Sequence, residues 1–330
     1  MDRSVYSIRP FLDADFEAEA RIDREVDPEH AATVEELRHW NEILSLEPDR
    51  ANLRFAVEET ATGQVVGYGN LAQPSFNYDP HRFWSWVAVA PAHQRRGIGA
   101  ELFSRLEEEA LARNGLGMWG NTREEDPAGV RFLEQRGFRI LHKIWLSRLD
   151  LTTLDLSAVP DRSSSLTREG IRFSTLAEEG ATSAETRQSL YRLCELSGAD
   201  VPRIGSFHPV SYEEFVAIDL ESPGAIPEAI FLACQGTEVV GMSSLEKDLA
   251  RPDTVRIGYT GTHPEFRGSG IGTELKRRGV LFAHERGFRF LITGNDSLNQ
   301  PILAINQRFG FRPETVWIQG EKVLGSTSRS

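Results

Sequence analysis

The sequence repeats itself, and this internal duplication limits the folds open to the chain more than any other feature. Four pairs of segments match, and they are VVGYGNL at 65–71 with VVGMSSL at 239–245, PAHQRRGIG at 91–99 with PEFRGSGIG at 264–272, RGF at 136–138 with FGF at 309–311, and Gly120-Asn121 with Gly294-Asn295. The two members of every pair lie 173 or 174 residues apart. A near-constant separation over four landmarks indicates that one whole domain has been duplicated.

Each copy is long enough to form a domain with its own hydrophobic core. The chain has 330 residues, of which 40% are hydrophobic and 26% are charged, and this suits two globular domains. The stretch 157–170, SAVPDRSSSLTREG, is rich in serine, proline and charge, which is typical of a linker. We therefore expect a first domain at 1–155, a linker at 156–170 and a second domain at 171–330.

Composition also restricts the partners and the location of the protein. The net charge of −12 repels the phosphate backbone of nucleic acids and favours a cationic substrate such as a small amine. The sequence has no apolar run long enough to span a membrane and no secretion signal at its start. Cys194 and Cys234 are far apart and no metal-ligand spacing occurs, which predicts free thiols, a cytoplasmic location and no metal.

Both copies show the same order of expected elements. Strands are expected at 53–58, 64–71 and 83–89 in the first copy, and at 229–234, 238–245, 254–260 and 289–293 in the second. Apolar side chains recur at helical spacing after each glycine-rich segment, so a helix is expected to open there. A further helix from Pro301 is expected to end at Gly310. This order predicts an α/β fold, with a mixed sheet and helices on both of its faces in each copy.

The glycine-rich segment that follows the third strand is the part of each copy that indicates a chemistry. It reads QRRGIG at 94–99 and RGSGIG at 267–272. Glycines let the backbone approach a ligand closely, and a helix N-terminus offers free N–H groups and about half a positive charge. Together they favour a bound phosphate or pyrophosphate. The Walker A loop and the dinucleotide fingerprint fit worse, because the lysine of the first and the third glycine of the second are missing.

These segments resemble the coenzyme A loop of the GNAT superfamily of N-acyltransferases, whose pattern is Gln/Arg-x-x-Gly-x-Gly/Ala. The pairs Gly137-Phe138 and Gly310-Phe311 stand where that superfamily has them. The second copy, with Asn295, Asn299 and Asn306, is similar to the C-terminal half of mycothiol synthase-like tandem members. The resemblance implies two tandem GNAT domains that use acetyl-CoA or CoA, with two central strands that splay apart where this ligand enters.

The resemblance also implies which residues bind coenzyme A. The strand before each loop would bind the pantetheine arm through its backbone, and these residues are Val87, Ala88, Val89, Thr260, Gly261 and Thr262. The loops would hold the pyrophosphate, and these residues are Gln94, Arg95, Arg96, Gly97, Ile98, Gly99, Ala100, Arg267, Gly268, Ser269, Gly270, Ile271, Gly272 and Thr273. Asn299 is a further candidate for binding in the second copy.

Residues that could move protons depart from the pattern of the superfamily. The superfamily often has a tyrosine acid four residues before the Gly-Phe pair, where this chain has Leu133 and Asn306. It often has a base carboxylate on the strand before the loop, and neither copy has one there. The candidates are therefore Glu246 as base, Tyr259 as acid and Asn306 as hydrogen-bond donor. A solvated strand end, sheet packing and helix capping are their structural alternatives.

Three functions remain open at this point. The first is transfer of an acetyl group from acetyl-CoA to a primary amine of a small molecule by direct attack, with the more polar second copy as the catalytic one. The second is a non-catalytic protein that binds acyl-CoA, because both copies lack the usual acid and base. The third is acetylation of a peptide or protein. We expect a monomer or homodimer, with neither nucleic acid nor membrane as partner.

Overall fold

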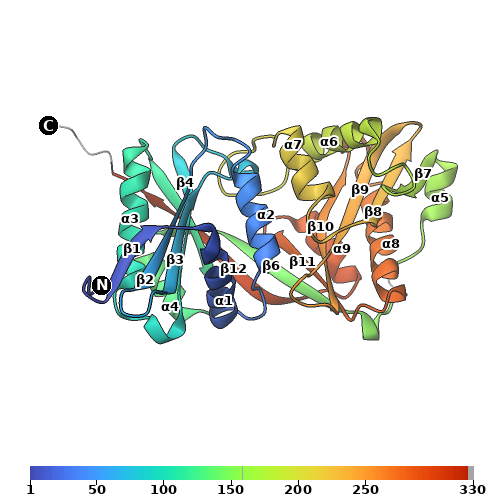
Figure 1. Ribbon diagram of the computed structural model, residues 1–330. Coiled ribbons are helices and arrows are strands. Elements are labelled where there is room, and N and C mark those ends of the chain that lie inside the picture. The colour runs from blue at the N-terminus through green and yellow to red at the C-terminus, as the bar shows by residue number, and fades with distance from the viewer. Residues whose placement is uncertain (158, 326–330) are drawn as a thin grey trace. The chain divides into compact units, whose positions relative to one another are not determined.

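The computed structural model describes residues 1–157 and 159–325, which form two compact units. Unit 1 comprises Met1–His142, Ile204–Ser206 and the described residues from Ile318 on. Unit 2 comprises Lys143–Arg203 and Phe207–Trp317. Figure 1 shows the course of the chain with its elements labelled. Each unit has its own hydrophobic core.

Unit 1 has a mixed sheet with helices packed on it. Its strands are β1 (Tyr6–Pro10), β2 (Asn52–Glu59), β3 (Gln64–Ala72), β4 (Arg82–Val89), β5 (Gly117–Arg123) and the C-terminal part of β12 (Arg312–Val323). Its helices are α1 (Phe16–Val26), α2 (Val34–Leu44), α3 (Ile98–Ala112) and α4 (Pro127–Gln135), with the short turns η1 (Asp13–Asp15), η2 (Ser75–Asn77) and η3 (Pro91–His93). The strand order is β1-β2-β3-β4-β5-β12. Strands β1 to β4 are antiparallel neighbours, whereas β4 and β5 are parallel.

Unit 2 repeats this arrangement. Its strands are β6 (Arg139–Asp150), β7 (Ile171–Thr175), β8 (Ala225–Gln235), β9 (Glu238–Lys247), β10 (Thr254–Thr262) and β11 (Phe290–Asp296), and β6 starts in unit 1. Its helices are α5 (Ser163–Arg168), α6 (Ala184–Gly198), α7 (Tyr212–Phe215), α8 (Ile271–Glu285) and α9 (Gln300–Arg308), with the π-turn η5 (Val216–Leu220) and the 3-10 turns η4 (Leu151–Thr153) and η6 (Pro264–Phe266). The strand order is β6-β11-β10-β9-β8-β7. Only β10 and β11 are parallel among the described pairs of this unit.

The last strand of each sequence copy completes the sheet of the other unit. Strand β6 follows α4 in the sequence, but it pairs with β11, where Ser147 lies opposite Thr293. Strand β12 follows α9 and lies beside β5, and Leu324 N donates to Leu116 O at 2.9 Å. The compact units therefore have different bounds from the domains expected at 1–155 and 171–330. Those bounds describe the sequence repeat, and they stay a prediction.

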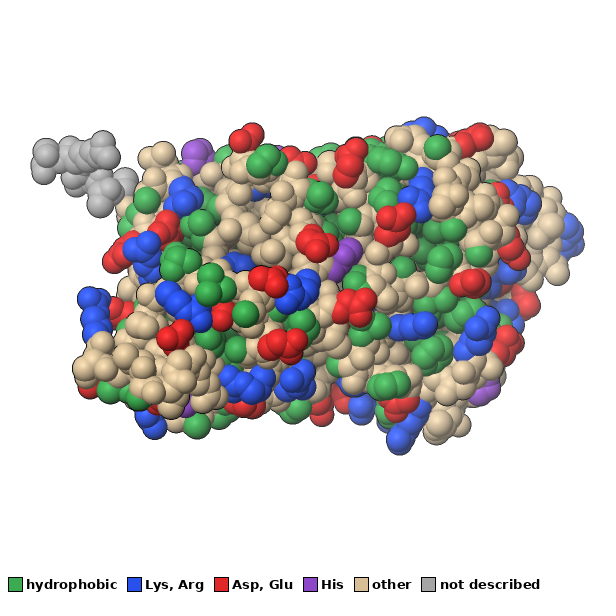
Figure 2. Space-filling model, viewed as in Figure 1, with side chains coloured by type: hydrophobic (Ala, Val, Ile, Leu, Met, Phe, Trp, Pro, Cys, Tyr) green, Lys and Arg blue, Asp and Glu red, His purple; other side chains and the backbone are tan. Residues whose placement is uncertain are grey.

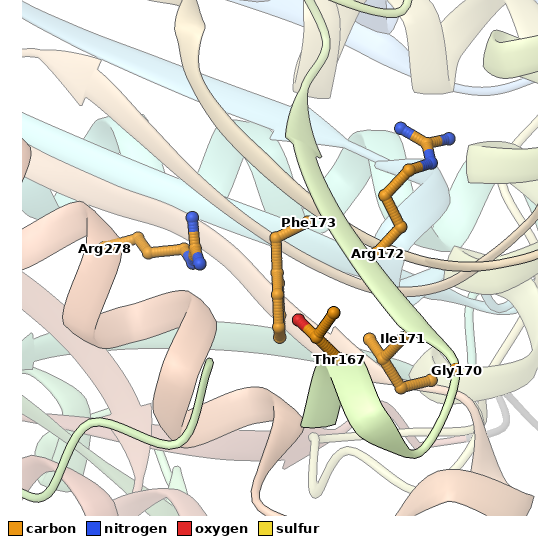
Figure 3. A pocket seen from close by; sticks show the side chains of 6 residues that line it. All are labelled: Thr167, Gly170, Ile171, Arg172, Phe173 and Arg278. Carbon is orange, nitrogen blue, oxygen red and sulfur yellow. The ribbon is translucent and has the colours of Figure 1, made fainter. Parts of the chain in front are cut away.

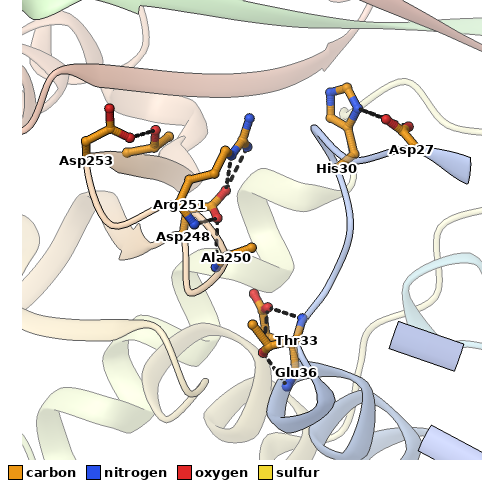
Figure 4. A network of polar contacts seen from close by, with 9 residues as sticks. Asp27, His30, Thr33, Glu36, Asp248, Ala250, Arg251 and Asp253 are labelled. Atoms are coloured by element: carbon orange, nitrogen blue, oxygen red, sulfur yellow. Dashed lines mark hydrogen bonds and ion pairs between the residues drawn. The ribbon is translucent and has the colours of Figure 1, made fainter. Parts of the chain in front are cut away.

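Local side chains fix the ends of several elements. At the start of α2, Thr33 Oγ1 accepts from Glu36 N at 3.3 Å, and the Glu36 carboxylate accepts from Thr33 N at 2.9 Å (Figure 4). After β9, Asp248 accepts from Arg251 N at 2.9 Å and pairs with the Arg251 guanidinium at 2.7 Å (Figure 4). This turn sets the start of β10, which is the strand that leads to the second glycine-rich loop.

The predicted elements are present. The stretches expected as strands fall in β2, β3, β4, β8, β9, β10 and β11. Each glycine-rich segment opens a helix, α3 or α8, and the helix expected from Pro301 is α9. Gly310 follows it with a φ of +86°, a conformation that commonly ends helices. The predicted α/β fold class is confirmed.

The segment expected as a linker is packed rather than free. It contains α5, and Val159 and Leu166 are 2% and 1% exposed in the core of unit 2. These two side chains are apolar residues in a mostly polar stretch. The serine, proline and charged residues around them are what predicted a linker. Their burial anchors the segment in the core of unit 2. A hydrogen bond from Arg162 N to the Glu274 carboxylate of α8, at 3.2 Å, holds it there as well.

The surface mixes charges of both signs. Figure 2 shows acidic and basic side chains interspersed over the visible face rather than gathered by sign. Many of the described charges are paired, as in the Arg148–Glu314 bridge at 2.6 Å. None of the described helices combines the length and the apolar character that a membrane span requires.

Candidate functional site

The parallel strands of each unit separate soon after they meet. The described pairing of β10 with β11 ends at Arg256 with Ile292, although β10 runs on to Thr262. The described pairing of β4 with β5 ends at Trp84 with Trp119, although β4 also continues. Beyond these points the facing edges of β4 and β10 carry backbone groups that no parallel neighbour takes up. Extended molecules with amide groups can bind to such an edge.

The second glycine-rich loop is open to a ligand. A Cβ atom at Gly268 would meet nothing within 4 Å, and φ is +78° there. Gly270 is the N-cap of the 15-residue helix α8 and has a φ of +97°. Bonding within α8 begins with Glu274 N to Gly270 O at 3.0 Å, so the preceding N–H groups of the first turn have no partner inside the helix. Ile271 N donates to Ser269 Oγ at 3.4 Å, and the N–H groups that follow it at the start of this long helix suit a phosphate.

Arg162 adds a positive charge at this loop. Its Nη1 donates to Ser269 O at 3.1 Å and would lie 2.5 Å from a Cβ atom at Gly270. The side chain itself is exposed, whereas its backbone N is held by the buried carboxylate of Glu274. A guanidinium beside a helix N-terminus is the combination that proteins use for phosphate groups.

The first glycine-rich loop has the same backbone conformation as the second. Gly97 is the N-cap of α3 and has a φ of +80°. A Cβ atom there would lie 2.7 Å from Met1 N, and Arg96 Nη1 donates to Tyr6 OH at 2.8 Å. At the matched position of the second loop, Gly270, a Cβ atom would lie 2.5 Å from Arg162 Nη1, so both helix starts are contacted at this position.

Unit 1 has large apolar side chains at the point where its parallel strands stop pairing. Trp84 and Trp119 are 3% and 1% exposed, and the Trp84 ring stacks on Trp86 at 5.7 Å between centroids. Ile204 packs on this group and is 1% exposed. Such tight packing is that of a hydrophobic core rather than of a substrate site.

Two of the predicted catalytic residues come together in unit 2, on the α6 side of its sheet. The Tyr259 hydroxyl lies 2.6 Å from Ser197 Oγ of α6, and burial raises the pKa of this tyrosine, which keeps it protonated. Glu246 Oε1 would lie 2.5 Å from a Cβ atom at Gly258, the residue before Tyr259. Gly258 and Tyr259 form a bulge in β10, because the register with β9 shifts between Ile257 and Thr260. Bulges often re-aim side chains next to active sites.

Asp219 of η5 joins these residues. Burial, and after it the charge of Glu246, raises the pKa of Asp219 to about 7. Two carboxylates that share a site cannot both ionise easily, so one of them titrates near neutral pH. A carboxylate with such a pKa suits a general base. Asp219 also stands in a π-turn, a distortion frequently found at functional sites.

The third predicted catalytic residue, Asn306, lies apart from these, between α8 and α9. It is 3% exposed, and its Nδ2 donates to Asn295 Oδ1 at 2.7 Å. Its Oδ1 accepts a hydrogen bond from Nζ of Lys276, which is 1% exposed. Asn299 is the N-cap of α9 but makes no capping hydrogen bond with its side chain, and it does not belong to this network.

The other predicted binding residues lie at the loops or strand ends as expected. Gln94 Nε2 donates to Val89 O at 3.0 Å, and Arg267 Nε donates to Thr262 O at 3.3 Å. These two side chains hold the loops to the strands. Arg267 also pairs with Asp200 at 2.5 Å, so its guanidinium is engaged by groups of the protein itself. Residues whose backbone N–H groups open the two helices are Ile98, Gly99, Ala100, Ile271, Gly272 and Thr273.

Sequence reasoning missed Arg162, Asp219 and Lys276. Arg162 stood in the segment expected as a linker, and neither Asp219 nor Lys276 was singled out from the sequence. Contacts that reveal them join residues far apart in the chain, as from Arg162 to Ser269 and Gly270. The one available signal was the comparison of the copies, since Lys276 stands opposite Phe103 at the offset of 173.

A cavity of about 350 Å³ lies elsewhere in unit 2, at the start of β7 (Figure 3). Its lining residues are Thr167, Gly170, Ile171, Arg172, Phe173 and Arg278. Its two guanidinium groups are already paired, Arg172 with Glu179 and Arg278 with Glu274 at 3.2 Å. None of the predicted site residues lines this cavity, so it is not part of the candidate site.

Comparison with known proteins connects this geometry to a family. The family model described as Acetyltransferase (GNAT) family matches residues 11–138 and 192–311, one match in each copy. Mycothiol acetyltransferase of Amycolatopsis mediterranei (strain U-32) is 26% identical over 266 residues, which cover 77% of this chain and 79% of that protein.

Two solved structures share the fold over the whole chain. A tandem GNAT protein from the clavulanic acid biosynthesis pathway superposes with a TM-score of 0.75 at 20% identity, covering 98% of this chain and 100% of the other. A GCN5-related N-acetyltransferase from Sphaerobacter thermophilus gives 0.69 at 20% identity, with 98% and 96% covered. With both copies matched by the family model, the chain belongs to the acetyltransferase (GNAT) family as a tandem-domain N-acetyltransferase.

Proposed function

We propose that the chain transfers an acetyl group from acetyl-CoA to a primary amine of a small molecule, and that the second copy carries out the transfer. The observation that carries this proposal is the contrast between the copies. The second loop has open space at Gly268 and the Arg162 guanidinium beside it, whereas in unit 1 Trp84 and Trp119 pack together where the parallel strands stop pairing.

Backbone groups would bind most of the acetyl-CoA molecule. The pyrophosphate fits the N–H groups from Gly268 to Thr273, with the Arg162 guanidinium as counter-charge. The pantetheine amides fit the edge of β10 from Thr260 to Thr262, which β11 does not cover. In this proposal, the thioester lies in the gap between β10 and β11.

The amine would attack the thioester carbonyl directly. Asp219 and Glu246 lie on the α6 side of β10, where an ammonium ion is attracted by their charge and can give up a proton. Orientation of two bound reactants can lower a barrier by roughly 7–11 kcal/mol, so positioning supplies much of the rate. Tyr259, held protonated and bonded to Ser197, would donate a hydrogen bond on this side.

A small-molecule acceptor agrees with the relatives, whose name, mycothiol acetyltransferase, denotes a small-molecule product. The net charge of −12 would attract a cationic amine. In unit 1, the carboxylate of Glu19 is paired with Arg54 and that of Asp23 accepts from Tyr68 OH at 2.5 Å, so both are engaged in its core. The first copy would then serve as a scaffold. Cytoplasmic location and a monomeric or dimeric state stay predictions.

The test is release of free thiol from acetyl-CoA in the presence of a panel of small amines and of short peptides. The expected result is release above the hydrolysis background with at least one small primary amine, and product mass increased by one acetyl group. Release only with peptides would replace the small-molecule acceptor by a protein acceptor. Tight binding of acetyl-CoA without release for any acceptor would show a binding protein and contradict the proposal.

A further inference from the structure

Lys276 is a lysine buried without a carboxylate. It is 1% exposed on α8, and Nζ donates to Asn306 Oδ1 of α9 and lies 5.5 Å from the centroid of the Phe311 ring. Burial alone lowers the pKa of Lys276 to about 7, and no charged group of the described residues contributes to the shift. Burying an ammonium ion without a counter-charge is costly, so stability does not explain why this position is a lysine.

The first copy shows that the fold does not need a polar residue here. Phe103 stands opposite Lys276 at the offset of 173, and Leu133 likewise stands opposite Asn306. Both are buried, and the Phe103 ring lies 5.7 Å from Phe138, the counterpart of Phe311. The same place between the helices is therefore apolar in one copy and polar in the other.

The polar group in the second copy lies next to the gap between the parallel strands. Asn306 donates to Asn295 Oδ1, and Thr293 Oγ1 donates to the same oxygen at 3.4 Å. Thr293 and Asn295 belong to the part of β11 that is no longer paired with β10. These hydrogen bonds hold the Lys276 ammonium group beside the strand edge to which the proposed function assigns the acyl thioester. They position this group and do not themselves carry its proton, because both donors end on the Asn295 oxygen.

We propose that Lys276, held by Asn306, gives a proton to the coenzyme A sulfur as the thiolate leaves the second copy. The amine nitrogen forms a bond to the carbonyl carbon and loses a proton to the carboxylates on the α6 side. The carbon–sulfur bond breaks, its electron pair goes to sulfur, and the ammonium proton of Lys276 converts the thiolate to the thiol. Solvent returns a proton to Lys276 after the products leave. The inference rests on the proposed function of the second copy.

The direction of the transfer follows from charge. A negative charge on sulfur stabilises the ammonium form of a nearby lysine, so the pKa of Lys276 rises as the bond breaks and the proton is available when it is needed. A lysine with a pKa near neutral also gives up its proton easily, whereas a lysine in water does not. The Asn306 amide, fixed by Lys276 on one side and Asn295 on the other, holds the two helices at this position.

The test compares the wild type with Lys276→Met and with the double variant Lys276→Phe/Asn306→Leu. The double variant copies the packing that the first copy already uses, so it keeps the test informative if the single variant folds poorly. We expect both variants to bind acetyl-CoA within about threefold of the wild type and to lose roughly 100-fold in kcat. The alkaline limb of the wild-type kcat profile, where Lys276 loses its proton, should disappear.

Phe103→Met is the matched control, since it changes the same position in the first copy. It should leave kcat and the pH profile of the wild type unchanged. A folded Lys276 variant with wild-type kcat and an unaltered alkaline limb would overturn this inference while amine-dependent thiol release still supports the proposed function. A wild type that acetylates no amine would overturn both. A purely structural role would lower stability in the variants without removing the alkaline limb.

Discussion

Asp219 and Glu246 are the two carboxylates proposed to take the proton of the attacking amine. Their carboxylates share a partly buried site, and the charge of Glu246 adds to the burial that raises the pKa of Asp219. A base is active in its deprotonated form, so the pKa of about 7 predicts that kcat/KM rises with pH through that value. Removing either carboxylate should act on this rise in a different way.

Glu246→Gln is expected to move the acid limb of kcat/KM to lower pH, because the like charge that raises the pKa of Asp219 is gone. Asp219→Asn is expected to lower kcat/KM by roughly 100-fold, since the base itself is removed. Both are measured as pH profiles of thiol release at saturating acetyl-CoA. An acid limb at unchanged pH in Glu246→Gln would mean that the charge of Glu246 does not affect the pKa of the base.

Arg162 is expected to bind the pyrophosphate. Arg162→Ala should weaken acetyl-CoA binding by about 1 kcal/mol, roughly fivefold, because an exposed charge–charge contact contributes little more than that. Calorimetry at two salt concentrations measures the effect, which should shrink as salt increases. Arg168→Ala, at the end of α5, is the control and should change nothing. Equal affinities of Arg162→Ala and Arg168→Ala for acetyl-CoA would mean that Arg162 does not bind the pyrophosphate.

Lys276 should also make the stability of unit 2 depend on pH. Its pKa is lowered from 10.5 to about 7 in the folded chain, so the unfolded chain binds more protons between these values. The free energy of unfolding of the wild type should therefore rise with pH from about 7 to about 10 relative to that of Lys276→Met. Urea denaturation at pH 6, 8 and 9.5 measures this difference. A difference that is constant over this range would mean that Lys276 titrates normally.

Residues whose roles depend on local contacts could be predicted from the sequence, and residues whose roles depend on distant contacts could not. Gly97 and Gly270 were predictable, because a positive φ at a helix start is a local requirement that glycine meets. Glu246 was within reach as the carboxylate nearest to the loop strand. Asp219 and Arg162 were not, since their roles arise only when segments distant in the sequence pack together.

At the scale of elements, the parallel strand pairs decide what each copy can hold. In unit 2 the separated strands have polar neighbours on both sides, Lys276 with Asn306 on one and Asp219 with Glu246 on the other. In unit 1, Trp84 and Trp119 of the last paired positions pack on each other and on Ile204. The same fold thus has polar groups at this place in one copy and an apolar cluster in the other.

Trp119→Ala tests the assignment of the first copy to a scaffold. Trp119 is 1% exposed and packs against Trp84 and Ile204, so its loss should lower the free energy of unfolding by about 3–5 kcal/mol. If the first copy takes no part in the reaction, kcat of the folded variant at low temperature should equal that of the wild type. Denaturation and thiol release measure the two effects. A large loss of kcat in a folded variant would give the first copy a catalytic role.

The order of the elements could be predicted, but their exchange between copies could not. Alternating apolar residues and glycine-rich turns identified the strands at 53–58, 64–71 and 238–245 locally. Strand β6 follows α4 in the sequence, yet it pairs with β11 of the other copy. Two equivalent partners offer the same pattern of apolar residues, so the sequence of a strand does not say which of them it joins.

At the scale of the whole molecule, a duplicated sequence forms two units that surround the same backbone loop with different side chains. Both keep a glycine with positive φ at the start of a 15-residue helix, so the backbone for phosphate binding is present twice. At the second loop, open space at Gly268 is combined with the positive charge of Arg162. The central claim is therefore that binding and transfer of the acetyl group belong to the second copy.

The most direct test of this claim compares Gly270→Asp with Gly97→Asp in one assay of acetyl-CoA binding and amine-dependent thiol release. Both substitutions place a side chain and a negative charge at a position with positive φ, so their intrinsic strain is matched. We expect Gly270→Asp to abolish thiol release and to weaken binding by about 3 kcal/mol, on the order of 100-fold. Gly97→Asp should retain wild-type turnover. Wild-type turnover in Gly270→Asp, or its loss in Gly97→Asp, would contradict the account.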